Sequence, residues 1–233
     1  MASEIKQGTL ELVNHLPILQ VITPMLIAPI LVVLNNKTLS WLLSFLGALA
    51  CLFISILLMQ TVSDGSILTY YLGGWVPPIG IEYRIDAANS ILLFLISIIS
   101  AIVLIFSYSS LHAEIPEEKH TLFYSCFLLC LTGLLGVVAT ADIFNVFVFL
   151  EISSLSTYVL VAQGAYLDRR ALSASFNYLI MGTIGATFFV IGIGYIYMAT
   201  GSLNMMDIAE RVNQLSDNRT IQAGFAFIVV GMG

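Results

Sequence analysis

Charged residues are scarce in this 233-residue chain: Asp, Glu, Lys and Arg make up 9% of it, whereas 59% is hydrophobic. A soluble domain carries about 25% charged residues, so the composition excludes an ordinary water-soluble protein and indicates an integral membrane protein. Basic residues are the scarcer sign, and the net charge is −6. We therefore expect no nucleic-acid partner, because nucleic-acid-binding domains concentrate Lys and Arg.

Cysteine is also scarce, since only Cys51, Cys126 and Cys130 are present and all three lie in apolar runs. This number and spacing give neither a disulfide framework nor a metal-binding motif. We interpret the three thiols as small buried hydrophobic groups. The sequence also lacks nucleotide-binding loops and catalytic Ser/His/Asp sets, so we expect no cofactor and no metal.

Long apolar runs are abundant, and about 20 such residues are needed to cross a bilayer as a helix. Six runs are long enough, at residues 17–34, 40–60, 87–110, 121–140, 142–162 and 171–200. The fourth and fifth runs as one helix would measure about 63 Å, so we expect a break at residues 140–142. Asp142 is then the N-cap of the fifth helix, because its carboxylate can accept from the first free amides. The sixth run is long enough to predict a tilt or a local break.

A shorter apolar run extends from residue 221 to residue 233. As a helix it would rise only about 20 Å. We expect it to be part of a seventh helix, and the chain to be the N-terminal portion of a longer protein. The predicted fold class is thus an all-α polytopic membrane protein with six complete transmembrane helices.

Between the second and third runs, paired glycines and prolines precede the alternating residues Ile81, Tyr83 and Ile85. This pattern predicts a small hairpin near residues 71–86 at the membrane surface. Trp75 and Tyr83 are expected at the membrane–water interface, where amphipathic aromatic rings are enriched.

The basic residues indicate an orientation. If the helices alternate in direction, the cations divide into two sets, Lys6, Arg84, Arg211 and Arg219 on one side and Lys37, Lys119, Arg169 and Arg170 on the other. The second set lies in the shorter loops, which places those loops in the cytoplasm and the N-terminus outside by the positive-inside rule. The loop that holds His112, Lys119 and His120 could admit protons, although a solvated charged loop is the favoured interpretation.

Glu151 is the one acidic residue that falls well inside a predicted span. It lies nine residues after Asp142, about 13 Å into the helix and near the bilayer midplane. A charge at this depth costs roughly 2.5–3.5 kcal/mol even on insertion scales, and such residues usually carry protons or ions. A structural hydrogen bond or ion pair that fixes helix packing is the alternative. The six spans contain no Lys or Arg, so a basic partner for Glu151 would have to come from elsewhere.

Helical spacing places Phe144, Phe147, Ser154 and Tyr158 on the same face as Glu151. The two hydroxyls extend the carboxylate into a polar stripe, which should face other helices or water because lipid cannot satisfy it. In the sixth span, Gly182 and Ala186 form a small-xxx-small pair that favours close helix packing.

Three segments carry a family resemblance: LGGWVPPIGIEYRIDAANSILL (72–93), DIFNVFVFLEISSLSTYVLVA (142–162) and ASFNYLIMGTIGATFFVIGIGYIYMATGSLNMMDIA (174–209). The chain resembles the antiporter-like subunits that Mrp-type multisubunit cation/proton antiporters share with respiratory complex I. Within this family it resembles most the D subunit of the Mrp-type systems. In this family a glutamate on the fifth helix, which matches Glu151, pairs with a lysine on the seventh helix. No lysine follows residue 220 in this sequence.

The resemblance implies a proton-translocating subunit of a monovalent cation (Na⁺)/H⁺ antiporter in the inner (cytoplasmic) membrane. Its partners would be other membrane subunits, protons and a monovalent cation. Residues 1–120 would hold helices one to three, and residues 121–233 would begin the antiporter-like repeat. Two alternatives stay open. One is a proton-pumping subunit of an NADH:quinone oxidoreductase or membrane-bound hydrogenase, whose redox centres lie on partner proteins, and the other is a structural scaffold subunit.

Overall fold

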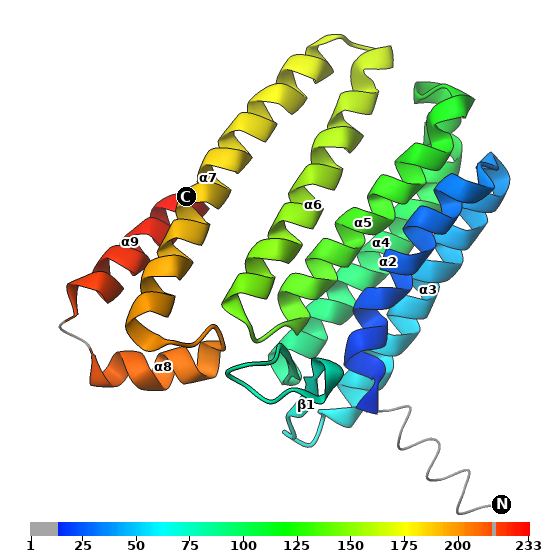
Figure 1. The fold of residues 1–233 in the computed structure, drawn as a ribbon. Coiled ribbons are helices and arrows are strands. Elements are labelled where there is room, and N and C mark those ends of the chain that lie inside the picture. The colour runs from blue at the N-terminus through cyan, green and yellow to red at the C-terminus, as the bar shows by residue number, and fades with distance from the viewer. Residues whose placement is uncertain (1–13, 216–217) are drawn as a thin grey trace, which may run out of the picture.

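The computed structural model describes residues 14–215 and 218–233, which form an almost entirely helical molecule (Figure 1). Six of its helices are long and apolar enough to cross a membrane. They are α2 (Leu16–Leu34), α3 (Lys37–Thr61), α4 (Ala87–Glu114), α5 (His120–Ala139), α6 (Ile143–Gln163) and α7 (Arg170–Thr200). The predicted multi-pass helical fold is confirmed, and each predicted span coincides with one of these helices.

The break between the fourth and fifth spans lies at residues 140–142. α5 ends at Ala139, Thr140 adopts an extended conformation, and the Asp142 carboxylate accepts a hydrogen bond from the Asn145 amide at 2.7 Å. By contrast, α7 contains no break: it is one continuous helix that ends where Gly201 adopts a left-handed conformation (φ 68°). Of the two alternatives predicted for this span, the local break is therefore absent, and a tilt in the membrane stays a prediction.

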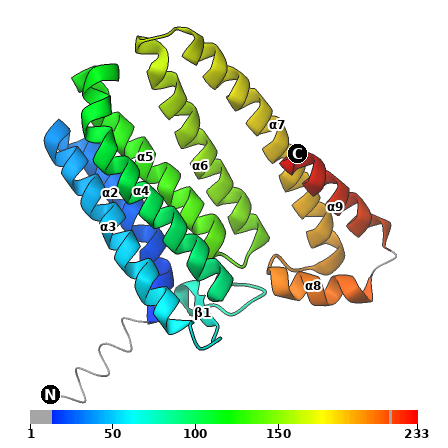
Figure 2. The ribbon, with the colours of Figure 1, turned by 180° about the vertical axis from the view of Figure 1, so that it is seen from behind.

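Helices α2, α3, α4 and α5 pack side by side as a bundle (Figures 1 and 2). Its core is formed by fully buried leucines such as Leu31, Leu93 and Leu128. Some buried polar groups of the bundle are bonded between helices, as when the Gln20 amide nitrogen donates to the Ser97 hydroxyl at 3.1 Å. Such bonds satisfy side chains that lipid could not.

α6 joins this bundle through Phe149, which is only 6% exposed. Its ring lies against Gly136 of α5, so closely that a Cβ at residue 136 would be 2.4 Å from the ring. The other side of α6 is turned toward α7, which runs antiparallel to it (Figure 1).

A second, smaller core lies between α7 and two short helices, α8 (Met205–Gln214) and α9 (Arg219–Met232). α7 and α9 approach closely because glycines face each other: a Cβ at Gly192 would lie 2.6 Å from the Gly224 carbonyl oxygen. The sequence predicted an apolar helix in the region of α9 but not α8. α8 carries Ile208 and Val212 toward this core, while Glu210 on the other face is exposed.

The hairpin near residues 71–86 consists of β1 (Leu68–Tyr71) and β2 (Glu82–Ile85), which pair antiparallel with Tyr70 opposite Tyr83. Trp75 lies in the connection between them and is 62% exposed. Tyr83, however, is only 2% exposed and packs near Phe149, with ring centroids 6.5 Å apart. The Tyr83 ring is thus covered by protein, its depth at the membrane–water interface stays a prediction, and burial raises the pKa of its hydroxyl to about 12.

The helices alternate in direction, so their connections lie at two ends (Figure 1). We call the end with β1, β2 and α8 the hairpin end, and the end with residues 35–37, 115–119 and 164–169 the Lys37 end. The described cations divide between these ends as alternation predicts, while Lys6 lies outside the described residues. At the Lys37 end, Lys37 hydrogen-bonds Glu117 and lowers the pKa of that exposed carboxyl.

Two of the three residues singled out in the loop at the Lys37 end, His112 and Lys119, are exposed. His120 is only 1% exposed, and its Nε2 lies 2.9 Å from the Ile115 carbonyl oxygen. The expectation of a solvated side chain was wrong at this position, because His120 begins α5 and is packed into the bundle.

Candidate functional site

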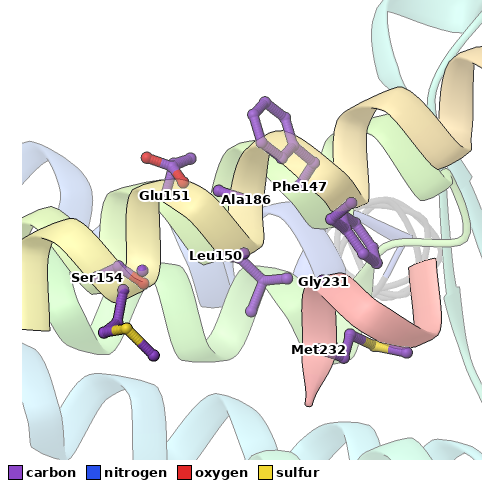
Figure 3. A pocket seen from close by; sticks show the side chains of 11 residues that line it. Phe147, Leu150, Glu151, Ser154, Ala186, Gly231 and Met232 are labelled. Carbon is purple, nitrogen blue, oxygen red and sulfur yellow. The ribbon is translucent and has the colours of Figure 1, made fainter. Parts of the chain in front are cut away.

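Glu151 lies on the wall of an open groove between α6, α7 and α9, with a volume of about 410 Å³. α6 contributes four side chains from consecutive turns of one face: Phe147, Leu150, Glu151 and Ser154. The last turn of α9 contributes Gly231 and Met232. Figure 3 shows the labelled lining residues gathered from these three helices.

The orientation of Glu151 follows from how α6 is packed. Phe149 fixes one face of the helix against α5, so helical periodicity turns Phe147, Glu151 and Ser154 toward α7. The short side chain of Ala186 on α7 then leaves the groove beside the carboxylate open.

No cation is bonded to Glu151 within residues 14–215 and 218–233. The ion pairs of this part of the chain, Lys37 with Glu117 and Arg211 with Asp207, lie at the two ends of the molecule instead. Phe147, Leu150 and Phe189 make the groove largely apolar. An ionised carboxylate in such surroundings is costly unless a proton, a cation or water reaches it.

The two hydroxyls of the predicted stripe occupy different positions. Ser154 lines the groove one turn from Glu151. Tyr158 is 6% exposed, and its hydroxyl lies where Gly182 has no side chain, 1.9 Å from the position of a Cβ there. Its ring meets that of Tyr178 edge-on, with centroids 4.8 Å apart. Tyr158 therefore lies beyond the groove lining, toward the Lys37 end.

The face of α6 turned toward α5 carries a second polar group that the sequence interpretation missed. Cys130 of α5 has its sulfur 3.4 Å from the Thr157 hydroxyl and 3.7 Å from the Ser153 hydroxyl. Cys130 was predicted only as a small buried hydrophobic residue, whereas it is partly exposed and bonded to polar neighbours. The signal was present, since Ser153 and Thr157 lie four residues apart on one helix face.

A further polar junction, also missed, lies at the hairpin end. The buried Glu82 carboxylate of β2 accepts a hydrogen bond from the Asn204 side chain at 2.7 Å, although 122 residues separate them in sequence. Asp142 lies beside this junction, and burial raises the pKa of its carboxyl. Its carboxylate is the N-cap of α6, nine residues before Glu151.

Six apolar spanning helices and a mid-helix carboxylate in an interhelical groove define the chain as a multi-pass membrane protein with an acidic group inside its helical region. Residues 140–233 match the family model described as "NADH:quinone oxidoreductase/Mrp antiporter, TM". Residues 140–233 of the chain thus carry a domain of this family, and the resemblance seen in the sequence is confirmed.

Among its relatives, the chain is 40% identical over 222 residues to NADH-quinone oxidoreductase subunit N of Desulforudis audaxviator (strain MP104C), covering 94% of this chain and 44% of the relative. It is 30% identical over 219 residues to the D subunit of the Na(+)/H(+) antiporter of Alkalihalophilus pseudofirmus (strain ATCC BAA-2126 / JCM 17055 / OF4), covering 93% of this chain and 43% of the relative. The chain thus spans less than half the length of these relatives.

Solved structures share the fold. A chain of the membrane-bound sulfane sulfur reductase, an archaeal respiratory membrane complex, superposes with a TM-score of 0.82 and 32% identity, over 94% of this chain and 44% of that one. A chain of the Mrp complex from Dietzia sp. DQ12-45-1b gives a TM-score of 0.78, over 94% and 40% of the two chains. At 21% identity the second likeness concerns the fold alone.

Proposed function

We propose that the chain is part of a proton-translocating membrane subunit of a multisubunit monovalent cation/proton antiporter, with Glu151 as the proton-carrying acid. The observation that carries this proposal is the position of Glu151: it lies in the interior of a 21-residue spanning helix and lines an open groove. Ionisable residues at such depth commonly mark proton or ion pathways. Kinship with the Na(+)/H(+) antiporter of A. pseudofirmus, through its D subunit, supports the exchange of Na⁺ for protons.

Ser154 and Tyr158 have supporting roles in this proposal. Ser154 lines the groove one turn from Glu151 and can hydrogen-bond a water or a protonated carboxyl there. Tyr158 holds the α6–α7 contact at Gly182, and the Ser175 hydroxyl donates to the Tyr158 carbonyl oxygen at 2.7 Å. These contacts keep α6 and α7 in register beside the groove.

A second function uses the same acid but a different energy source. In it the chain belongs to a proton-pumping subunit of an NADH:quinone oxidoreductase or related respiratory complex, whose redox centres lie on partner proteins. The identity of 40% to an NADH-quinone oxidoreductase subunit favours it, as does the likeness to the sulfane sulfur reductase complex. In both functions the partners are other membrane subunits, and the proton reaches Glu151.

The test compares Glu151→Gln with Glu210→Gln in the native membrane complex, in sealed inverted vesicles. Glu210 is exposed on α8 and outside the groove, so the same chemical change there is a matched control. Proton movement is followed with a pH-sensitive dye after addition of Na⁺, or after addition of NADH and quinone. We expect Glu151→Gln to reduce proton flux at least about tenfold, as for a lost acid–base group, and Glu210→Gln to leave it unchanged.

The outcomes separate the three functions. A response to Na⁺ in the parent complex supports the antiporter, and a response to NADH supports the redox-driven pump. If Glu151→Gln leaves assembled complex in normal amount but without flux, Glu151 carries protons. If instead the complex no longer assembles, Glu151 is structural and the scaffold function is correct.

For the orientation, we propose that the chain resides in the cytoplasmic membrane with its Lys37 end inside and its N-terminus outside. The Lys37 end carries Lys37, Lys119, Arg169 and Arg170 in short loops, which supports this by the positive-inside rule. A single cysteine introduced at residue 169 of a cysteine-free variant should react with an impermeant maleimide in inverted vesicles and not in whole cells. The opposite labelling pattern would reverse the orientation.

We also propose that residues 1–120 form an N-terminal three-helix part and that residues 121–233 begin the antiporter-like repeat. The family match supports a distinct second part, because it begins at residue 140. A chain starting at residue 121 that still inserts and binds partner subunits would agree with this division.

A further inference from the structure

Three segments that are distant in sequence meet at the hairpin end. Isolated antiparallel bridges pair Tyr83 with Thr140 and Asp142 with Asn204, so the α5–α6 turn lies between β2 and the α7–α8 turn. The Ala141 amide donates to the Glu82 carbonyl oxygen at 2.9 Å, and the Met205 amide donates to the Ala141 carbonyl oxygen at 2.8 Å. The Ile143 amide, in the first turn of α6, donates to the Leu203 carbonyl oxygen at 2.9 Å.

One side-chain bond spans this junction directly. The Glu82 carboxylate accepts from Asn204 Nδ2 at 2.7 Å, with the two residues 7% and 3% exposed. The other atom of the same amide, Asn204 Oδ1, accepts from the Met206 and Asp207 amides at 3.0 and 3.3 Å and so caps α8. Asn204 therefore joins the hairpin to the start of α8 with opposite ends of one amide group.

The charged groups around this pair do not neutralise Glu82. Arg211 bonds the Thr200 carbonyl oxygen and lies 3.9 Å from Asp207, and Asp207 accepts from the Ser202 hydroxyl. Asp142 faces Asn145, whose amide it caps. Arg84, two residues along β2, forms no ion pair with Glu82 in the described part of the chain. The amide of Asn204 is thus the side-chain donor that satisfies the buried carboxylate.

We propose that Glu82 and Asn204 are a positioning pair for proton transfer: they fix the α7–α8 turn against the start of α6 and thereby set the spacing of the groove walls at Glu151. This inference rests on the proposed function of Glu151. α6 begins and α7 ends at this junction, and these two helices supply the facing walls of the groove. A displacement of the α7–α8 turn therefore moves Gly182 and Ala186 relative to the carboxylate.

The chemistry of Asn204 allows the pair to be tested without disturbing the α8 cap. Asn204→Asp keeps an oxygen that can accept from Met206 and Asp207, but it places a second carboxylate against Glu82. Two carboxylates in contact cannot both ionise easily, so they share a proton at low pH and repel at high pH. We expect the flux of this variant relative to the parent to be near normal at pH 6 and about tenfold lower at pH 9.

Two further variants complete the set. Glu82→Gln keeps an oxygen acceptor for Asn204 and should retain flux at both pH values. The double change Glu82→Gln with Asn204→Asp reverses the direction of the hydrogen bond, since the new amide donates to the new carboxylate. It should restore flux at pH 9, which a merely destabilising effect of Asn204→Asp would not do.

Backbone amide exchange provides a readout that does not depend on transport. The Ala141, Ile143 and Met205 amides bond across the junction, so their exchange in the purified complex should accelerate at pH 9 in Asn204→Asp and return to the parent rate in the double variant, after correction for the intrinsic effect of pH. The proposal is overturned if Asn204→Asp shows the parent pH profile, or if the double variant stays as impaired as the single one. If flux survives in Glu151→Gln, it is the proposed function that fails; exchange at these amides then still reports whether the pair holds the junction.

Discussion

The α2–α5 bundle and the α6–α7–α9 region both use small residues for close packing, but only the second region also leaves a groove beside a carboxylate. In the bundle, small residues bring helices together and the remaining space is filled, so that Gly136 of α5 is covered by the ring of Phe149. In α7, Gly192 likewise lies against the backbone of Gly224 in α9, whereas Ala186 borders a groove that stays open. The difference teaches that glycine in a membrane helix predicts close approach of a neighbour only where a large side chain or backbone occupies the facing position.

Polar groups follow the same division. Gln20 and Ser97 of the bundle bond to each other, and the hydroxyl of Ser125 donates to the Ala28 carbonyl oxygen at 2.8 Å. Glu151 faces the groove without such a partner in the described part of the chain. A rigid bundle thus supports a helix whose far side is available for chemistry, which is why loss of packing and loss of transport should be separable by mutation.

The largest effect on stability is expected from Gly136→Ala. The new Cβ would lie 2.4 Å from the buried Phe149 ring, which α5 and α6 hold in place. Overpacking of this kind costs about 1–3 kcal/mol. The matched control is Gly194→Ala, whose Cβ meets no atom within 4 Å and which should gain about 0.5–1 kcal/mol from higher helix propensity. Thermal unfolding in detergent measures both, and equal melting temperatures would contradict the comparison.

Gly182→Ala should lower stability less than Gly136→Ala does, but it should reduce proton flux more. Its Cβ would lie 1.9 Å from the Tyr158 hydroxyl, which is the far end of a side chain and can move. We expect a loss of about 1 kcal/mol, partly recovered when Tyr158→Phe removes the hydroxyl. A double-mutant cycle on melting temperature and proton flux checks this coupling. Strict additivity of the two changes would show that the contact does not constrain α6 and α7.

At Asp142 two substitutions should separate the effect of the N-cap hydrogen bond on stability from the effect of the carboxylate charge. Asp142→Ala loses the N-cap of α6 and about 1 kcal/mol at pH 3.5, a loss that shrinks as pH rises, whereas Asp142→Asn keeps a capping oxygen. Burial raises the pKa of Asp142 above its unfolded value, so the folded state binds more protons between the two pKa values. Stability of the parent therefore declines as pH rises above about 3.9 until the raised pKa is passed. Asp142→Asn should match the parent at pH 3.5 and exceed it in melting temperature at pH 8.

The smallest effect is expected from Lys37→Gln at the Lys37 end. Lys37 lowers the pKa of Glu117, so their pairing stabilises the protein above the usual pKa of glutamate and is lost as pH falls through the lowered value. Both side chains are largely exposed, and water and salt screen such pairs. We expect a melting temperature at pH 7 that is unchanged within error in 0.5 M salt. A loss comparable to that of Gly136→Ala would mean that this loop contact fixes the bundle.

Much of this architecture could be predicted because a bilayer imposes simple rules on sequence. The apolar runs gave helices close to the observed ones, and Thr140 and Asp142 marked the break between α5 and α6 because one helix would be too long to fit. α8 was missed because its apolar residues form a short amphipathic stripe rather than a run. The hairpin residues were assigned to a strand pair, but which of them would be buried depended on Phe149 and Thr140 of other segments.

The sequence by itself determined that the chain crosses a membrane as α-helices and that Glu151 lies deep within one of them, because hydropathy, helix length and capping are local properties. Only the tertiary structure decided that Phe149 and Glu151 face opposite neighbours, that a groove stays open beside the carboxylate, and that Glu82 meets Asn204. These depend on which helices pack together, and contacts between residues as much as 122 positions apart leave no periodic signal in the chain.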